Sequence, residues 1–200
     1  AIKVARSKNK KASTKAQEEF KKKIKTEVRH YIKLGFKIFV LDEAHFLVKP
    51  YRTKGWFLKG SKPTVETIHT KERISAFGAL SKDELFTQTT EEKCNNETYL
   101  TFLNDLLRKY GKIVIVIDGS KYHFEKEHVQ KFYEENKNCL KVFQLPPYSP
   151  ELSPIEQTWK KTKKWLSIAI WGTKSEFKTE LLKALDSPSI KVKMFDYYVR

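Results

Sequence analysis

The chain has few cysteines and no long apolar run, and both shortages restrict what it can be. Cys94 and Cys139 are the only cysteines among 200 residues, and neither has a CxxC spacing or a histidine cluster beside it. We therefore expect two reduced, partly buried thiols rather than a zinc site or a disulfide framework. No apolar stretch approaches the roughly 20 residues that span a bilayer, and no hydrophobic segment opens the N-terminus. The sequence predicts an intracellular, cytoplasmic protein with no membrane partner.

Acidic residues are scarce relative to basic ones. Forty Lys and Arg against 24 Asp and Glu leave a net charge of +16. Such an excess predicts a polyanionic partner, most simply nucleic acid, with a membrane surface as the weaker alternative. Residues 1–26 carry half of it, with ten Lys or Arg and two Glu. Because residues 1–12 have no hydrophobic period, we expect a basic arm there, which either lies along phosphates or is a solvated tail.

Internal repeats and low-complexity blocks are absent, so residues 13–200 are expected to form one domain. A hydrophobic content of 40% is enough for one sizeable core at this length. Periodicity predicts a helix between Ser13 and Gly35, a strand over Lys37 to Asp42, and then hairpin-linked strands. Those strands are expected around Trp56 to Leu58, Val65 to His69, Ile74 to Ser81 and Leu85 to Thr89.

Helices and strands then alternate along the second half of the chain. The expected order is a helix from Asn95 or Asn96 to Gly111, a strand ending at Asp118, a helix over Glu125 to Asn136, a strand over Leu140 to Gln144, and helices over Ser153 to Ile168 and Lys174 to Leu185. An antiparallel meander followed by alternating strands and helices predicts an α/β protein. We expect a ribonuclease H-like fold, with a mixed five-stranded sheet and helices on both faces.

Three carboxylates stand where chemistry is expected. Asp42 and Asp118 each end a buried apolar run, and Glu156 opens a helix behind the proline-rich segment 145–154. Adjacent strands lie about 4.8 Å apart, so the two aspartates share metal ions if their strands are neighbours. Taken singly, an Asp after a strand is more often a turn residue. Glu156 has a second interpretation too, because Ser153, Pro154 and Glu156 have the spacing of a capping box.

The set of three favours metal chemistry on phosphate. Crowded carboxylates repel, so without metal at least one is expected to hold a proton. Oxygen-only ligation favours Mg²⁺, with Mn²⁺ able to substitute. Two such ions activate a water or sugar hydroxyl and stabilise the leaving oxygen of an in-line displacement. The implied reaction is phosphodiester cleavage or strand transfer.

The sequence around these acids resembles a known family. The blocks Leu41 to Phe46, Ile117 to His123 and Leu145 to Lys160 are similar to the three catalytic blocks of mariner-related insertion-sequence DDE transposases, and the third block is the most specific. The resemblance extends over about residues 20–185. It implies that Asp42, Asp118 and Glu156 form the catalytic, metal-binding triad of a magnesium-dependent endonuclease and DNA strand transferase.

The same resemblance implies the partners. Such enzymes cut double-stranded DNA at the ends of their element and join the 3′ hydroxyl to target DNA, commonly at TA. Cooperation between two ends implies a homodimer, and an insertion sequence implies a nucleoid-associated protein of a prokaryote. Gly119 and Ser153 stand where the family commonly has Asn. The family's N-terminal helix-turn-helix domain is missing, so we expect a catalytic fragment or half of a split reading frame.

Basic residues near the acids are candidates for DNA contacts. His123 occupies a family position, where it either touches phosphate, supports a metal ligand or has no role. Lys160, Lys161, Lys163 and Lys164 follow Glu156, and part of this cluster, together with Lys121, is expected to contact phosphates. Lys160 has the alternative of pairing with Glu156. Trp159 and Trp165 are expected in the core, and Tyr148 is expected to pack its loop first and contact DNA second.

Two other functions fit the same residues. One is a ribonuclease or resolvase on the same scaffold, because a fold does not fix a function. The other is a decayed or repurposed transposase that binds DNA through its basic surface and catalyses nothing, which Gly119 and the missing recognition domain favour. Cleavage assays on DNA and on RNA–DNA hybrids separate the three.

Overall fold

The computed structural model describes residues 11–49, 51, 56, 58–62, 64 and 70–199. Its elements are helices α1 (Thr14–Lys33), α2 (Asn96–Tyr110), α3 (Lys121–Phe124), α4 (Glu127–Glu135), α5 (Ile155–Leu166) and α6 (Lys174–Asp186), and strands β1 (Lys37–Leu47), β2 (Arg73–Leu80), β3 (Leu85–Thr90), β4 (Ile113–Ile117) and β5 (Leu140–Gln144). Three short 3-10 helices follow the later elements: η1 (Pro150–Leu152), η2 (Pro188–Ile190) and η3 (Asp196–Tyr198).

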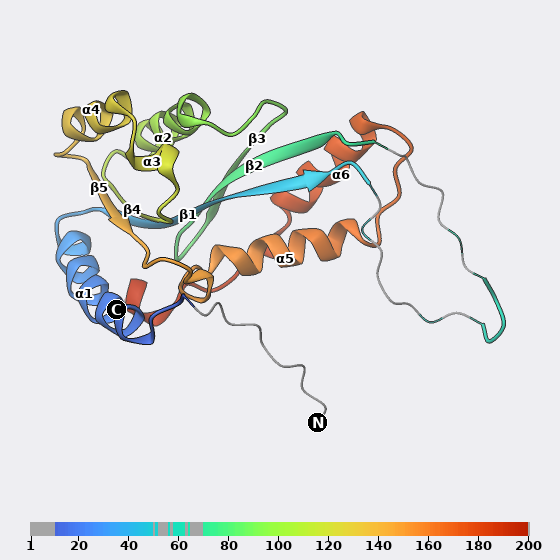
Figure 1. Cartoon of the computed structure of the whole chain (residues 1–200), viewed down its shortest axis with the longest axis horizontal. Coiled ribbons are helices and arrows are strands. Elements are labelled where there is room, and N and C mark those ends of the chain that lie inside the picture. The colour runs from blue at the N-terminus through green and yellow to red at the C-terminus, as the bar shows by residue number, and fades with distance from the viewer. Residues whose placement is uncertain are drawn as a thin grey trace.

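The five strands form one mixed sheet in the order β3-β2-β1-β4-β5 (Figure 1). β1 lies at the centre, antiparallel to β2 and parallel to β4. β3 is antiparallel to β2, and β5 is parallel to β4. This is the mixed five-stranded sheet that the sequence predicted.

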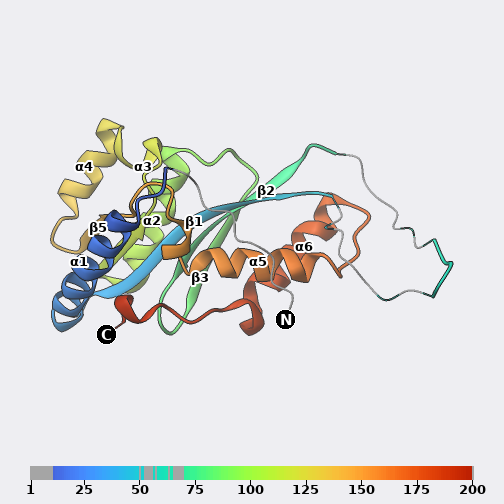
Figure 2. The same cartoon turned by 60° about the horizontal axis from the view of Figure 1, so that its bottom comes forward.

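Helices cover both faces of the sheet, as predicted. α2, α3 and α4 lie on one face, and α1 and α5 lie on the other (Figures 1 and 2). Alternate residues of β1 divide between the two cores. Phe39 and Leu41 pack with α2 and α4, whereas Ile38 and Val40 pack with α1, α5 and α6. Every residue of β4 is buried, because both of its neighbours are strands and both of its faces are covered.

Local signals explain why two helices lead directly into central strands. The Ser13 side chain accepts a hydrogen bond from the Ala16 amide at the start of α1, and Asn95 forms a capping box at the start of α2. Gly35 and Gly111, with φ of 79° and 74°, turn the chain out of these helices into β1 and β4. The carboxyl ends of the parallel strands are therefore brought to one edge.

Several predicted boundaries were wrong. β1 continues five residues beyond Asp42 to Leu47, because β2 pairs with it over that whole length. α4 begins at Glu127 rather than Glu125, and the short helix α3, which the sequence did not predict, precedes it. Trp56 and Leu58 lie outside any strand, and residues 65–69 lie outside the described residues. None of the described helices has the length and apolarity needed to cross a bilayer.

Candidate active site

Asp42 and Asp118 lie side by side at the end of the parallel pair β1 and β4. Val40 pairs with Val116 in register, and each aspartate lies two residues further along the chain. β4 stops at Ile117, whereas β1 continues beside β2. Asp42 is therefore inside a strand rather than at its end, and the edge of β1 beyond it has no strand on the β4 side. That open edge leaves room for a cleft.

Glu156 lies in the first turn of α5 and is not used as a cap. The predicted capping box is wrong, because Pro154 holds the N-cap position and no side chain caps the helix. Ser153 is instead the C-cap of the preceding 3-10 helix η1. Pro154 already has helical dihedral angles. The hydroxyl of Ser153 is buried and has no hydrogen-bond partner among the described residues. The carboxylate of Glu156 thus remains available to the cleft.

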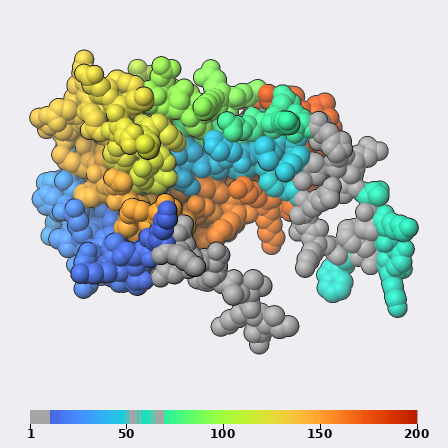
Figure 3. Space-filling view, viewed as in Figure 1, coloured from blue at the N-terminus to red at the C-terminus, as the bar shows by residue number. Residues whose placement is uncertain are grey.

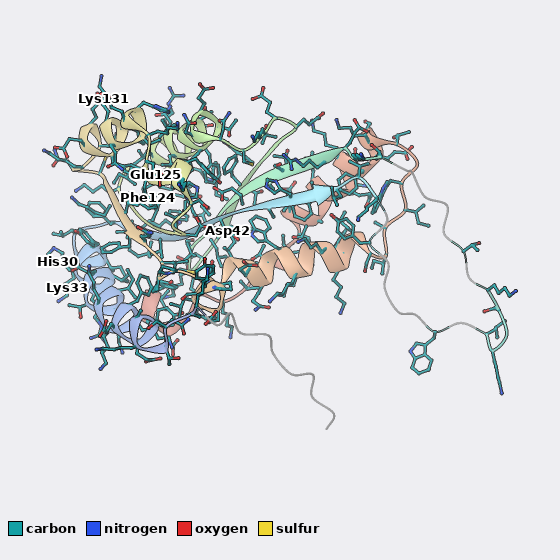
Figure 4. All side chains as sticks on the ribbon, in the orientation of Figure 1. His30, Lys33, Asp42, Phe124, Glu125 and Lys131 are labelled. Carbon is teal, nitrogen blue, oxygen red and sulfur yellow. The ribbon has the colours of Figure 1, made fainter. Side chains whose placement is uncertain are left out.

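A cleft of about 470 Å³ brings the three predicted acids together. Asp42, Asp118 and Glu156 all line it, along with Ser153 and the proline-rich loop. Figure 4 shows Asp42 on β1 close to the first turn of α5. Within the described part of the chain, no three acidic, His or Cys side chains converge closely enough to form a preassembled metal cluster.

Trp159 and Gly78 hold the Asp42 side chain in place. The indole Nε1 of Trp159 donates a 2.9 Å hydrogen bond to Asp42 Oδ2. Gly78 pairs with Asp42 across β1 and β2, and a Cβ at position 78 would lie 2.5 Å from the Trp159 ring and 2.9 Å from Ile155. Only glycine lets the ring approach this closely. Trp159 is a core residue, as predicted, and its role as a donor to Asp42 was missed.

Burial is the largest influence on the charge of Asp42. Burial, followed by the negative charges of Glu43 and Glu156, raises the pKa of Asp42 to about 8, although the Trp159 hydrogen bond opposes the rise. At neutral pH and without a cation, the Asp42 carboxyl therefore tends to hold a proton. A proton on one member of the set was expected from crowding alone, whereas burial is its main cause and neighbouring charge its second.

Asp118 has the opposite environment. The amide and hydroxyl of Ser120 donate hydrogen bonds of 3.0 and 3.1 Å to its two oxygens, and His123 Nδ1 lies 3.1 Å from Oδ1. The histidine contact is an ion pair rather than a well-aligned hydrogen bond. Burial raises the pKa of Asp118, but the contacts with His123 and Ser120 outweigh it and lower the pKa below its usual value. Asp118 is ionised at neutral pH.

His123 is a supporting residue and not a surface contact. Its side chain is 0% exposed, so it cannot touch phosphate in this conformation, and the prediction of a DNA contact is not supported. Nε2 lies 3.0 Å from Glu43 Oε1, on the face of β1 opposite Asp42. Burial lowers the pKa of His123, but Asp118 and Glu43 outweigh it and raise the pKa to about 9. Glu43 was missed, although strand alternation alone puts it across the sheet from Asp42.

The residues present fit a hard divalent cation. All three carboxylates offer oxygen ligands, the type that Mg²⁺ and Mn²⁺ prefer. Ser153, whose buried hydroxyl has no hydrogen-bond partner among the described residues, lines the same cleft. The raised pKa of Asp42 has its second cause in neighbouring negative charge that a cation would neutralise. Asp42, Asp118 and Glu156 are the residues that would hold it.

The predicted lysines differ in their surroundings. Lys121 and the α5 residues Lys160 and Lys164 are exposed, and Lys121 lies 3.7 Å from Glu125. Lys161 donates 3.0 Å hydrogen bonds to the carbonyls of Ser189 and Lys191, so its ammonium is directed to the C-terminal segment rather than to a free surface. No ion pair joins Lys160 to Glu156, both of which are described residues.

Comparison with known proteins identifies the family. Residues 37–178 match the DDE superfamily endonuclease family, which is most of the chain and includes all three acids of the cleft. The chain belongs to this family. A comparison with curated protein sequences found no match.

Solved structures of Mos1 mariner transposase have the same fold as this chain. The catalytic domain of Mos1 aligns with 94% of the chain and 87% of its own length, at a TM-score of 0.61 and 14% identity. The Mos1 paired-end complex with left transposon end gives 0.67 and 17%, and the Mos1 strand transfer complex gives 0.68 and 16%. The chain spans 61% of the Mos1 chains in these two complexes. The ribonuclease H-like fold predicted from the sequence is confirmed.

Proposed function

We propose that this chain is the catalytic domain of a transposase, which cleaves DNA phosphodiesters at the ends of a mobile element and transfers the strand to target DNA. The observation that carries the proposal is the shared cleft of Asp42, Asp118 and Glu156. Membership of the DDE endonuclease family and the fold shared with Mos1 transposase support it. The cofactor of the proposal is Mg²⁺, replaceable by Mn²⁺, with two ions in the cleft.

The chain's own residues supply binding and orientation. Asp118 stays ionised through Ser120 and His123, and the Trp159 indole holds one oxygen of Asp42 in place. Divalent cations held there would activate a water or 3′ hydroxyl and stabilise the leaving oxygen. Glu156 comes from a separate element, in the first turn of α5.

The proposed partner is double-stranded DNA, both element ends and a target, with TA as the target dinucleotide. Mos1 is known in complexes with transposon-end DNA and in a strand transfer complex, which supports this choice by kinship. We carry the homodimer and the nucleoid-associated, cytoplasmic location as parts of the same proposal. The net charge of +16 favours a polyanionic substrate such as DNA.

The side chain of Gln144 fills the space beside Gly119, the residue after Asp118. This favours an active site over a decayed one. A Cβ at Gly119 would collide with the carboxamide of Gln144, which comes from the end of β5 and lines the same cleft. Gln144 pairs with Ile117, the residue before Asp118, so the two positions are neighbours in the sheet. The space beside Asp118 therefore contains an amide side chain even though residue 119 has none.

The test is nicking of supercoiled plasmid DNA in the presence of Mn²⁺, because a plasmid presents many sequences at once. The wild-type protein should convert the plasmid to open circles. Asp118→Asn should lower the rate at least about 100-fold, because it removes a carboxylate that a cation requires. Asp186→Asn, which changes an exposed carboxylate outside the cleft, is the matched control. Equal nicking by Asp118→Asn and wild type would refute the proposal, and so would nicking of RNA–DNA hybrids in place of DNA.

A further inference from the structure

Tyr148 has a backbone conformation that its side chain does not favour. Its φ is 55°, and no other non-glycine residue in the described ranges has a positive φ. The left-handed region suits glycine and strains residues that carry a Cβ. A persistent strain of this kind is held by its surroundings, and it is concentrated at sites that bind or react.

The loop around Tyr148 is braced from two sides. Gln17 of α1 donates hydrogen bonds of 2.9 Å to Ser149 Oγ and 2.6 Å to Glu151, and the Ser149 hydroxyl donates to the Pro147 carbonyl. The Tyr198 hydroxyl donates a 2.9 Å hydrogen bond to the Leu152 carbonyl from the C-terminal segment. These contacts fix the backbone and would serve equally well with glycine at position 148.

Packing of the Tyr148 ring does not compensate for the backbone strain. Its side chain is 50% exposed, and it belongs to neither hydrophobic core. The expectation that it packs the loop first was therefore wrong. The ring instead lines the cleft that holds the three acids. In Figure 3 this loop (orange) meets the start of α1 (blue) on the visible surface.

A cation lies close to the same ring. Lys11 Nζ is 5.8 Å from the centre of the Tyr148 ring. An exposed aromatic face beside an ammonium group suits one nucleotide, whose base stacks on the ring while its phosphate meets the cation. Bases inside a duplex are already stacked on both sides, so only an unpaired base can use such a platform.

We propose that Tyr148 is a stacking platform for an unpaired nucleobase beside the phosphate that occupies the acidic cleft. The identity of the ligand as DNA rests on the function proposed above. Tyr148 touches substrate in this account and takes no part in proton or phosphoryl transfer.

The experiment uses a DNA duplex with a short single-stranded 3′ end that carries 2-aminopurine, a base whose fluorescence falls when it stacks. Ca²⁺ replaces Mg²⁺ so that binding is read without cleavage, and a fully paired duplex with the same label serves as reference. Four variants are compared with the wild type: Tyr148→Phe, Tyr148→Gly, Tyr148→Asn and, as the control for an exposed apolar side chain outside the cleft, Ile170→Ala.

Wild type, Tyr148→Phe and Ile170→Ala should quench the unpaired label equally. Tyr148→Gly and Tyr148→Asn should lose the quenching and bind the single-stranded end about tenfold more weakly. Their Tm should stay equal or rise, because both residues accept the left-handed conformation. Affinity for the fully paired duplex should not change.

Unchanged quenching in Tyr148→Gly overturns the inference, and so does a loss of quenching accompanied by a lower Tm, since that would indicate a packing role. The outcome is separable from that of the proposed function. A wild type that quenches the label but cuts no DNA with Mn²⁺ retains the platform and refutes the nuclease, and the reverse result refutes the platform alone.

Discussion

At the scale of single residues, the two aspartates of the cleft differ because their neighbours differ. Asp118 accepts hydrogen bonds from Ser120 and lies against His123, so its pKa is lowered. Asp42 is buried near Glu43 and Glu156, so its pKa is raised to about 8. One carboxylate is thus ready to hold a cation at neutral pH, whereas the other must first lose a proton. The pair gains its full charge only when positive charge enters the cleft.

This asymmetry predicts a stability effect of Asp42→Asn without metal. The folded pKa of Asp42, about 8, lies above its ordinary value of 3.8, so the folded state binds more protons between these values and its stability falls as pH rises through them. Asparagine has no charge and lacks that fall. In EDTA at pH 8, urea unfolding should give Asp42→Asn a free energy of unfolding at least about 1 kcal/mol above wild type, with a smaller difference at pH 5.5.

His123 does not obscure the comparison. Its pKa is raised to about 9, so its contribution is full below its unfolded pKa and is lost as pH rises towards 9 in both proteins. If Asp42→Asn is no more stable than wild type at pH 8, burial and neighbouring charge do not raise the pKa of Asp42.

The sequence predicted the parts of this site that depend on nearby residues in the chain. It did not predict contacts between residues far apart in the chain. The acids themselves were predictable, since two follow apolar strands and the third lies in a specific block. The supporting contacts join residues far apart in the chain: Trp159 reaches Asp42 across 117 positions, and His123 reaches Glu43 across 80. Only the packing of α5 and α3 on the sheet creates them. Local spacing also misassigned Ser153, because the residue that ends a 3-10 turn and the first residue of a capping box look alike in sequence.

At the scale of elements, α5 joins the cleft to a basic surface. Its buried residues, among them Ile155, Trp159 and Leu166, face the sheet, and its exposed stripe carries Lys160 and Lys164. At 1.5 Å per residue, these lysines lie roughly 6 and 12 Å along the axis from Glu156. That spacing leads away from the cleft at intervals similar to those of phosphates along a DNA strand, so the helix is expected to guide the backbone into the site.

The double variant Lys160→Ala/Lys164→Ala should weaken DNA binding without a loss of folding. If both lysines contact phosphate, the slope of log Kobs against log salt should become less steep by about 2. Lys33→Ala/Lys131→Ala is the matched control, because these lysines lie on α1 and α4, away from α5 (Figure 4). Fluorescence anisotropy over a salt series gives both slopes. Equal slopes for the two double variants would exclude α5 as the helix that contacts the DNA backbone.

At the scale of the whole molecule, the fold brings three distant carboxylates to one edge of the sheet. β1 supplies Asp42, the end of β4 supplies Asp118, and α5 supplies Glu156 from the opposite layer. Helices on both faces and a buried β4 make this frame rigid. Cation binding to the folded state alone should also raise its stability, by an amount that grows with the logarithm of the cation concentration above Kd.

The central claim is that these three carboxylates together hold divalent cations. The most direct test is anomalous diffraction from crystals of the wild-type protein grown with Mn²⁺. We expect manganese in the cleft, coordinated by oxygens of Asp42, Asp118 and Glu156. Manganese bound only elsewhere on the chain, or a Glu156 side chain turned away from an ion held by the two aspartates, would contradict it.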